Sequence, residues 1–543
     1  MLNLVIKGGR VVDGTGAPWF RADIGIEGDR IATVGRLEGV AAKRTVDAKD
    51  RLVTPGLIDA HTHSDLTIAI EPRASSAVTQ GVTTQVAGNC GVSAAPTIGG
   101  KPYYGPLDPT LTDGLGCDWT GFAGYFERLE RQGVATNLAT FVGHGNVRAS
   151  AMGYDDRAPT DAEITRMEDL TEEAMRDGAI GMTTGLAYIP GSYAKSEEIV
   201  RLARVVARHG GLYASHIRNQ TEGIVASVRE CLDVGRQAGI PAHVSHMQPG
   251  APRLGCAHEL LALIDDERRS GLDASCDAIP YTIGSTTLKS LLPPWACDGG
   301  DAAMIARLKD PATRRRIIDD TNIHGAESGG SRKRTLCKNG DWHKIWLASG
   351  TRNANLVGQD FRTIAKARGQ DPYDVLLDIL IEEEGKPWML AEDVSEEDFL
   401  DIARHAAGGV VSDGFSLHPE GPLARGRHHP RSYGAFARFL RRFVREDGKL
   451  SWEQAIHKLT GHPASRFRLS GRGVLKPGAF ADVCVLDPDQ VAETNDFGDP
   501  YRYARGIDWV LANGQVTLEQ GAATGALPGR VLRFRQGAAQ GTA

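Results

Sequence analysis

Two histidines stand one residue apart at the end of an apolar run, in the segment LVTPGLIDAHTHSD (residues 52–65). Alternate residues of a β-strand point to the same face, so His61 and His63 would present both imidazoles on one side of the strand's end. Two imidazoles crowded together fill an apolar core poorly and bind a metal ion well. The segment therefore predicts a metal site, provided that other parts of the chain supply more ligands.

Other strand-like runs also end in residues that can bind a metal. These are Cys90 in GNCG, His144 in GHGN, His216 in SHIR, His246 in SHMQ and Asp413 in SDG. Any one of them would be unremarkable as a satisfied core or loop residue. Burying all of them without partners would cost several kcal/mol, and a shared metal ion removes that cost. The mixture of imidazole, thiolate and carboxylate donors suits zinc.

The segments that must position these residues alternate between strand-like and helix-like patterns. The strand-like runs are 52–60, 83–88, 137–143, 178–184, 211–215, 241–245, 273–278 and 408–412. Helix-like segments at 161–178, 196–210 and 222–239 carry acidic residues near their starts and end at glycine. Eight strands alternating with helices predict an α/β fold, a (β/α)8 TIM barrel over about residues 52–470. Functional residues of such a barrel lie where its strands end.

Both ends of the chain, residues 1–51 and 471–543, contain short strands separated by glycine turns. A few strands at one end would leave unpaired edges, so we expect both ends to form one small β-sandwich. A long connection, residues 279–407, separates the seventh and eighth strands. Connections of that length are usually functional, and we expect an insertion at 286–345 to fold partly over the mouth of the site. A surface decoration without a role is the alternative.

Composition narrows the class of protein. The net charge is −6, with 41% hydrophobic and 24% charged residues, which is ordinary for a globular protein and unlike a nucleic-acid binder. The eight cysteines include no CxxC pair, which favours buried thiols in a reducing compartment. Neither a membrane span nor a secretory signal is evident, so we expect a cytoplasmic protein with a small-molecule partner. Whether it forms a homo-oligomer stays open.

The pattern of HxH after the first strand, histidines after the fifth and sixth, and aspartate after the eighth resembles the amidohydrolase superfamily. GNCG, the two SH segments and the C-terminal run from His428 to Asp489 narrow the resemblance to the D-aminoacylase (N-acyl-D-amino-acid deacylase) group. The resemblance implies a zinc-dependent hydrolase that cleaves a linear amide of N-acyl-D-amino-acid or N-acyl-amine type. It covers nearly the whole chain and is weakest in residues 289–370.

The resemblance also implies roles for the candidate ligands. Cys90, His216 and His246 would hold one tight zinc ion. A second, weaker or optional zinc would be held by His61, His63 and Asp413. Asp413 would act as general acid and base beside metal-activated water.

Much of the superfamily bridges two metals with a carboxylated lysine after strand four, and residues 178–184 contain no lysine. This argues against the alternative of a cyclic-amide hydrolase of the hydantoinase or dihydroorotase kind. His144 would lie either near the substrate or in a structural position. A barrel that has lost catalysis is a further alternative, which the full ligand set disfavours.

The chain departs from the D-aminoacylase pattern where that group grips the substrate carboxylate. The expected lysine two residues after His246 is Gln248, and the first tyrosine of the expected YPY is Ile279. Tyr188 and Ser285 are retained.

Another residue, such as Arg218 or Arg148, would compensate for the missing lysine and tyrosine. Alternatively, the substrate would be a larger or neutral amide without a free carboxylate.

Overall fold

Parallel strands occupy the middle of the chain, close to the predicted positions, in a computed structural model that describes residues 1–103 and 115–534. They are β6 (Leu57–Asp59), β7 (Val82–Ala87), β8 (Asn137–Thr140), β9 (Val142–Gly143), β10 (Gly181–Gly185), β11 (Leu212–His216), β12 (Ala242–Val244), β13 (Ala274–Ala278) and β17 (Gly408–Val410). They pair in the orders β6-β7-β8 and β9-β10-β11-β12-β13-β17. Every residue of these strands is buried, as is typical of parallel strands covered on both faces.

Two short links join these groups of strands. Only Phe141 separates β8 from β9, and a parallel bridge connects Thr62, after β6, with Gly414, after β17. The strand ends that carry the predicted ligands are therefore neighbours in space.

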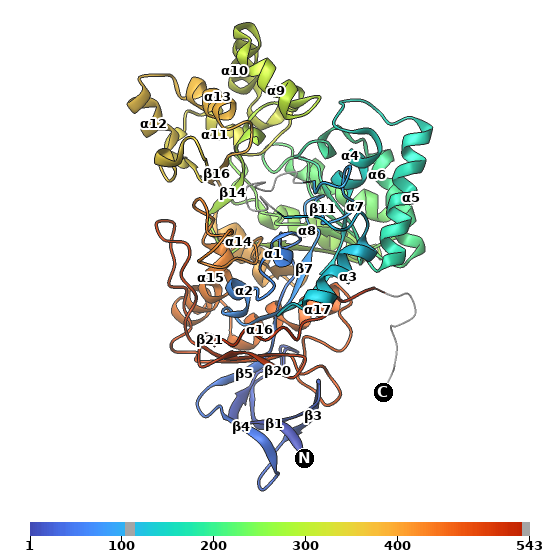
Figure 1. Cartoon of the computed structure of the whole chain (residues 1–543), viewed down its shortest axis with the longest axis vertical. Helices are drawn as coiled ribbons and strands as arrows, with labels where there is room; N and C mark the ends of the chain where they lie inside the picture. The colour runs from blue at the N-terminus through green and yellow to red at the C-terminus, as the bar shows by residue number, and fades with distance from the viewer. Residues whose placement is uncertain (104–114, 535–543) are drawn as a thin grey trace.

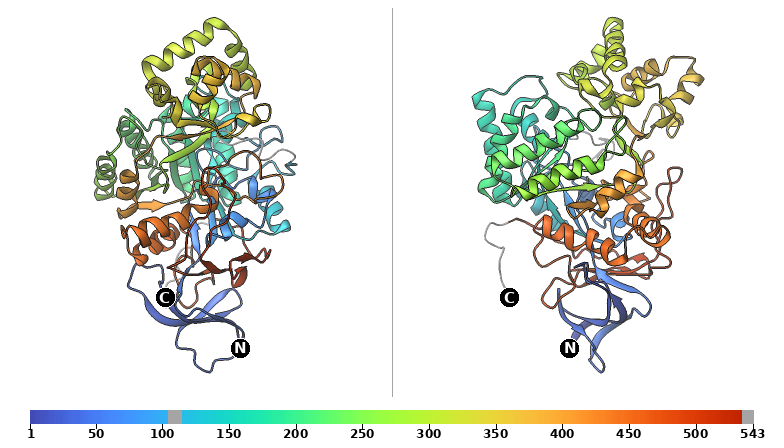
Figure 2. Two further views of the ribbon diagram at one scale, coloured as in Figure 1. Left: turned by 90° about the vertical axis from the view of Figure 1, so that its left-hand side faces the viewer. Right: turned by 180° about the vertical axis from the view of Figure 1, so that it is seen from behind.

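Helices follow most of the parallel strands and surround them (Figures 1 and 2). They are α1 (Thr67–Ile70), α2 (Ser75–Val78), α3 (Phe122–Gln132), α4 (His144–Met152), α5 (Asp161–Asp177), α6 (Ser196–Arg208), α7 (Ile224–Ala238), α8 (Ala257–Arg269), α14 (Glu396–Arg404), α15 (Arg431–Arg438), α16 (Trp452–Leu459) and α17 (Gly461–Arg466). The three helices expected from the sequence are α5, α6 and α7. Thr160 and Glu163 form a capping box at the start of α5, and Gly178 ends it.

The connection between β13 and β17 folds as a separate lobe, drawn in yellow-green at the top of Figure 1. Its elements are β14 (Ile283–Thr287), α9 (Asp301–Lys309), α10 (Pro311–His324), α11 (Arg334–Lys338), β15 (Ile345–Leu347), α12 (Phe361–Arg368), α13 (Pro372–Glu382) and β16 (Trp388–Glu392). A three-stranded sheet of order β14-β16-β15 and a hydrophobic core of its own hold it together. The lobe runs from 283 to 392, so the expected insertion at 286–345 is too short: β16, at its far end, is the central strand of the sheet.

Strands from both ends of the chain share one sheet at the opposite end of the molecule (Figure 1). They are β1 (Leu2–Val11), β2 (Phe20–Glu27), β3 (Arg30–Gly35), β4 (Ala42–Asp47), β5 (Leu52–Pro55), β18 (Val483–Leu486), β19 (Ile507–Ala512), β20 (Gln515–Glu519) and β21 (Ala522–Ala523). Side chains of the first five strands pack with those of β18 and β19 in one apolar cluster. Each fully buried Val or Ile of this cluster contributes about 1.5–3 kcal/mol.

The apolar run at 52–60 divides between the two units. Its first part, β5, pairs with β1 and β18 of the terminal sheet, and its second part, β6, pairs with β7. Only Gly56 lies between them, and a Cβ there would collide with Thr83. The expected boundary at 51–52 therefore moves to Gly56.

The C-terminal segment likewise leaves the terminal sheet before its end. Residues 528–534 run back along the parallel strands, where the backbone amide of Leu138 donates to the carbonyl of Arg530 and that of Phe534 donates to Gly178. Among the described residues, no helix has both the length and the apolar character to cross a membrane.

Candidate metal centre and active site

The predicted ligands follow the carboxyl ends of five parallel strands. His216 is the last residue of β11, and the others lie two to four residues beyond β6, β7, β12 and β17. Cys90, His246 and Asp413 have φ values of 52°, 32° and 53°. Non-glycine residues adopt this left-handed conformation rarely, and such residues cluster at functional sites.

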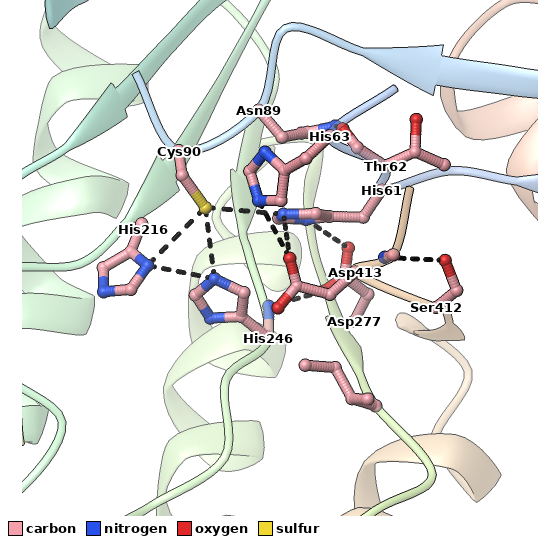
Figure 3. A network of polar contacts seen from close by, with 12 residues as sticks. His61, Thr62, His63, Asn89, Cys90, His216, His246, Asp277, Ser412 and Asp413 are labelled. Carbon is pink, nitrogen blue, oxygen red and sulfur yellow. Dashed lines mark hydrogen bonds and ion pairs between the residues drawn. The ribbon is translucent and has the colours of Figure 1, made fainter. Parts of the chain in front are cut away.

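Cys90, His216 and His246 converge on one point (Figure 3). The Cys90 Sγ lies 3.6 Å from His216 Nδ1 and 3.3 Å from His246 Nε2, and the two nitrogens are 3.0 Å apart. Two ligands of one tetrahedral zinc ion, with bonds of about 2.0–2.3 Å, lie about 3.3–3.6 Å apart. One zinc ion can therefore touch all three donor atoms.

A second donor group lies on the other side of Cys90. His63 Nε2 and His61 Nε2 are 2.9 Å and 3.5 Å from Asp413 Oδ1. His61 Nε2 is also 3.4 Å from Cys90 Sγ, so the thiol lies between the two groups. All these side chains are buried. The site accordingly offers room for one ion in the Cys90 group and a second beside Asp413.

The charges of the site favour an ionised thiol and carboxylate. Burial alone would raise the pKa of Cys90, but the imidazoles of His61 and His246 lower it well below its usual value. Burial likewise opposes ionisation of Asp413, whereas Arg431 and His63 hold its pKa well below the usual range. Arg431 Nη1 lies 2.7 Å from Asp413 Oδ2, which leaves Oδ1 toward the two histidines.

Asp277, at the end of β13, supports this arrangement from behind. Its carboxylate accepts a hydrogen bond from the backbone amide of His246 at 2.5 Å, lies 2.8 Å from His243 Nε2 and lies 3.7 Å from His61 Nδ1. The amide of Gln220 contacts His246 Nδ1 at 3.4 Å, on the side of the ring away from Cys90. These contacts orient the imidazole nitrogens that face the thiol.

The predicted substrate-binding residues fall into two groups. Tyr188, Ile279 and Ser285 line the same cavity as all the predicted metal ligands except His61. Gln248 is directed elsewhere: its side-chain amide exchanges two hydrogen bonds with the backbone of Ile279, at 2.9 Å and 3.1 Å. The side-chain amide of Gln248, which stands in place of the expected lysine, is therefore engaged by the backbone of Ile279.

His144 and Arg218 serve other contacts. His144 Nε2 lies 2.8 Å from Glu198, which also pairs with the fully buried Arg148. Arg218 pairs with Glu230 and donates to the carbonyls of Ser192 and Ala194. Arg218 thus holds the loop after β10, whereas His144 contacts helix α6, and neither contacts the predicted ligands in any described interaction.

Sequence reasoning missed several residues of the site. Arg431, Asp277 and Gln220 contact the predicted ligands, and Arg332 and Lys333 of the inserted lobe line the cavity. The two lobe residues belong to the basic run GGSRKRTLCKNG, whose charge was the one available signal. Nothing in the spacing of the run connects it with the parallel strands.

Strand β10 explains the missing lysine of the fourth strand. It ends at Gly185, where a Cβ would collide with the carbonyl oxygen of Cys90. The backbone of the cysteine loop thus packs where a larger residue would have to stand.

The sequence matches the model of the Amidohydrolase family over residues 44–279 and 362–518. The chain belongs to this family. Most of the inserted lobe lies outside the matched residues.

Two curated relatives come from Alcaligenes xylosoxydans xylosoxydans. The chain is 37% identical to a D-aminoacylase, over 98% of this chain and 97% of the relative. It is 36% identical to an N-acyl-D-glutamate deacylase, over 98% and 96%. Among solved structures, an N-acyl-D-glutamate deacylase from Bordetella bronchiseptica, complexed with zinc and a phosphonate inhibitor, is 34% identical with a TM-score of 0.82, over 98% of this chain and all of that one.

Proposed function

We propose that this protein is a zinc-dependent amidohydrolase that deacylates N-acyl amino acids or closely related N-acyl amines. The observation that carries the proposal is the convergence of Cys90 Sγ, His216 Nδ1 and His246 Nε2 within 3.0–3.6 Å of one another. The names of the relatives support the substrate class, and the zinc complex of one solved relative supports the metal.

The same proposal includes the architecture. The pairing of β6 to β13 and β17, with the bridge between residues 62 and 414, supports a closed (β/α)8 barrel. The shared terminal sheet and its apolar cluster support a small β-sandwich built from both ends of the chain. The lobe at 283–392 is then a third unit beside the mouth of the site.

Within the site, Cys90, His216 and His246 would hold one zinc ion, with His61, His63 and Asp413 available to a second. Zinc supplies a Lewis acid that polarises an amide carbonyl and eases deprotonation of water.

The protein's own contribution to proton transfer centres on Asp413. Arg431 holds one carboxylate oxygen, and the pKa of Asp413 lies well below its usual range, so the group is a proton acceptor at neutral pH. Its other oxygen is directed toward His61 and His63, where it can take a proton from water and deliver it to the leaving nitrogen.

Tyr188 and Ile279, which line the cavity beside the predicted metal ligands, would orient the substrate. Tyr188 packs on His216 with ring centroids 4.6 Å apart, and its hydroxyl accepts a hydrogen bond from Thr286 at 3.2 Å. Together with Ile279, Tyr188 excludes water from one side of the site, which strengthens electrostatic interactions inside it.

The test is release of free amine from a panel of N-acetyl D- and L-amino acids by the purified protein. We expect turnover that chelator abolishes and zinc restores. Asp413→Asn keeps the shape of the side chain, and we expect it to lower kcat by at least about 100-fold while the zinc ion of the Cys90 group is retained. The reasoning is wrong if the variant keeps full turnover. Opening of hydantoins in place of linear amides would instead favour the cyclic-amide alternative.

A further inference from the structure

The basic run of the inserted lobe reaches the cavity of the metal centre. Ser331, Arg332 and Lys333 lie just before α11 and line the cavity together with Cys90 and His246. The side chains of Arg332 and Lys333 are 9% and 6% exposed. Burying a cation to this degree costs folding free energy unless the cation is paired, so we expect anionic partners for both side chains.

Asp393, just after β16, provides one such partner. Its Oδ2 lies 2.6 Å from Arg332 Nε and 3.3 Å from Lys333 Nζ. One carboxylate therefore faces two cations, and the cluster carries one excess positive charge. The remaining cation of the cavity, Arg431, is already paired with Asp413.

The two cations of the cluster differ in how fully they are engaged. Arg332 donates through Nε to Asp393 and through Nη1 to the carbonyl of Gln248 at 3.0 Å, and these two hydrogen bonds fix the plane of its guanidinium. Lys333 has three N–H donors and one described hydrogen-bond partner, at 3.3 Å. Its Nζ lies beside Gly284, where a Cβ would be only 2.9 Å away, next to Ser285. Lys333 therefore has N–H donors left for a ligand, on a flexible side chain that lies in the cavity wall.

This cluster stands where the family resemblance leads one to expect a lysine. The expected position is 248, where the chain has Gln248 tied to Ile279, and Arg332 binds the carbonyl of that same glutamine. The lobe thus places a cation next to position 248, where the chain has no lysine.

We propose that Lys333, fixed by Asp393 and Arg332, binds the free carboxylate of the substrate and selects N-acyl amino acids over neutral amides. This inference rests on the proposed deacylase function and adds to it a residue that sets specificity. A carboxylate beside Nζ balances the excess charge of the cluster and gains a charge-assisted hydrogen bond. The acyl amide is then directed from the lobe toward the metal centre.

The test compares each N-acetyl amino acid with its own C-terminal carboxamide. Lys333→Met removes the charge while Arg332 still pairs with Asp393. We expect kcat/KM for the carboxylate substrates to fall about 100-fold, chiefly through KM, and that for the carboxamides to change less than about threefold. Lys338→Met, on the last residue of α11 with a side chain that is 30% exposed, is the matched control and is expected to change neither.

A pH profile gives a second readout. The pKa of Lys333 is lowered to about 8, chiefly by burial and further by the charges of Arg332 and Arg431. The carboxylate of Asp393 acts in the opposite direction and raises this pKa. His429, buried nearby, has a pKa well below its usual value and is neutral in this range. We therefore expect kcat/KM for carboxylate substrates to decline above about pH 8.

The decline should be absent for the carboxamides. Lys333→Arg keeps the charge through this range, so this variant should retain the carboxylate preference and lose the decline.

The outcomes separate the two proposals. If the wild-type protein releases amine from neither member of a pair, the deacylase function fails. If it hydrolyses both members equally, or if Lys333→Met slows both equally with zinc content unchanged, the deacylase function stands and the role of Lys333 is refuted.

Discussion

Asp277 gives a sharp test of how the metal centre is held, because it contacts the centre without being a predicted ligand. Its carboxylate is 2% exposed and lies within 2.5–3.7 Å of the His246 backbone amide, His243 Nε2 and His61 Nδ1. The pKa of Asp277 is held low by His243 and His61 against the effect of burial. The group is therefore ionised, orients the imidazole of His61 in one donor group and fixes the backbone of His246 in the other.

Asp277→Asn keeps the shape and one acceptor oxygen, so the backbone hydrogen bond of His246 can persist. The amide NH2 replaces the oxygen that faces His243 and His61, and the negative charge is lost. Changes of this kind behind a metal ligand weaken metal binding by about 10- to 100-fold, which is about 1.4 to 2.7 kcal/mol. We expect that loss in zinc affinity, with turnover restored at saturating zinc.

The assay is competition for zinc between the protein and a chromophoric chelator, with activity measured across the same zinc concentrations. Asp266→Asn, an exposed residue that pairs with Arg269 on α8, is the matched control and should bind zinc as the wild type does. Unchanged zinc affinity in Asp277→Asn would refute the positioning role. So would low activity that saturating zinc does not restore.

Three further predictions follow from buried contacts. Glu198→Gln leaves Arg148 buried without its carboxylate and should lower stability by about 3–5 kcal/mol in thermal or urea unfolding, whereas exposed Glu197→Gln should be neutral. The pKa of Glu198 in the folded state lies below its ordinary value of 4.5. The difference in unfolding free energy between wild type and variant should therefore be full above pH 4.5 and shrink as the pH falls through the folded-state pKa. A difference that stays constant with pH would contradict the reasoning. Gly185→Ala places a Cβ against the carbonyl of Cys90 and should reduce zinc content measured by metal analysis; full occupancy would show that the loop moves freely. Chelator should lower the melting temperature and zinc should raise it with concentration, since zinc would bind the folded chain alone; a melting temperature independent of zinc would argue against a structural metal site.

The positions of the parallel strands, and the residues that lie together at their ends, were predictable because each leaves a local mark in the sequence. Fully buried parallel strands give apolar runs of four to eight residues, and a polar residue at the end of such a run is conspicuous. His61, Cys90, His216, His246 and Asp413 all met this description. Relatives with more than 30% identity over nearly the whole chain support the family resemblance.

The errors have one physical origin, which is pairing between distant segments. Strand β5 pairs with β1 and with the distant β18, whereas β6, only one glycine further along, pairs with β7, and no local pattern marks that change of partner. The extent of the lobe depended on β16 pairing between β14 and β15. Gln248 and Arg218 were judged by residue type alone, whereas their contacts with Ile279 and Glu230 decide which way they point.

Because of the lobe between β13 and β17, the proposed reaction and the proposed choice of substrate depend on different parts of the chain. The predicted metal ligands follow parallel strands that pair with neighbouring strands. A small shift of these strands would separate the ligands. Lys333, which we propose selects the substrate, lies on a unit that has its own sheet and core and joins the parallel strands at two points of the chain. Such a unit can be altered, lengthened or exchanged while the reaction stays intact. Substitutions in the lobe can therefore change the substrate preference without loss of catalysis.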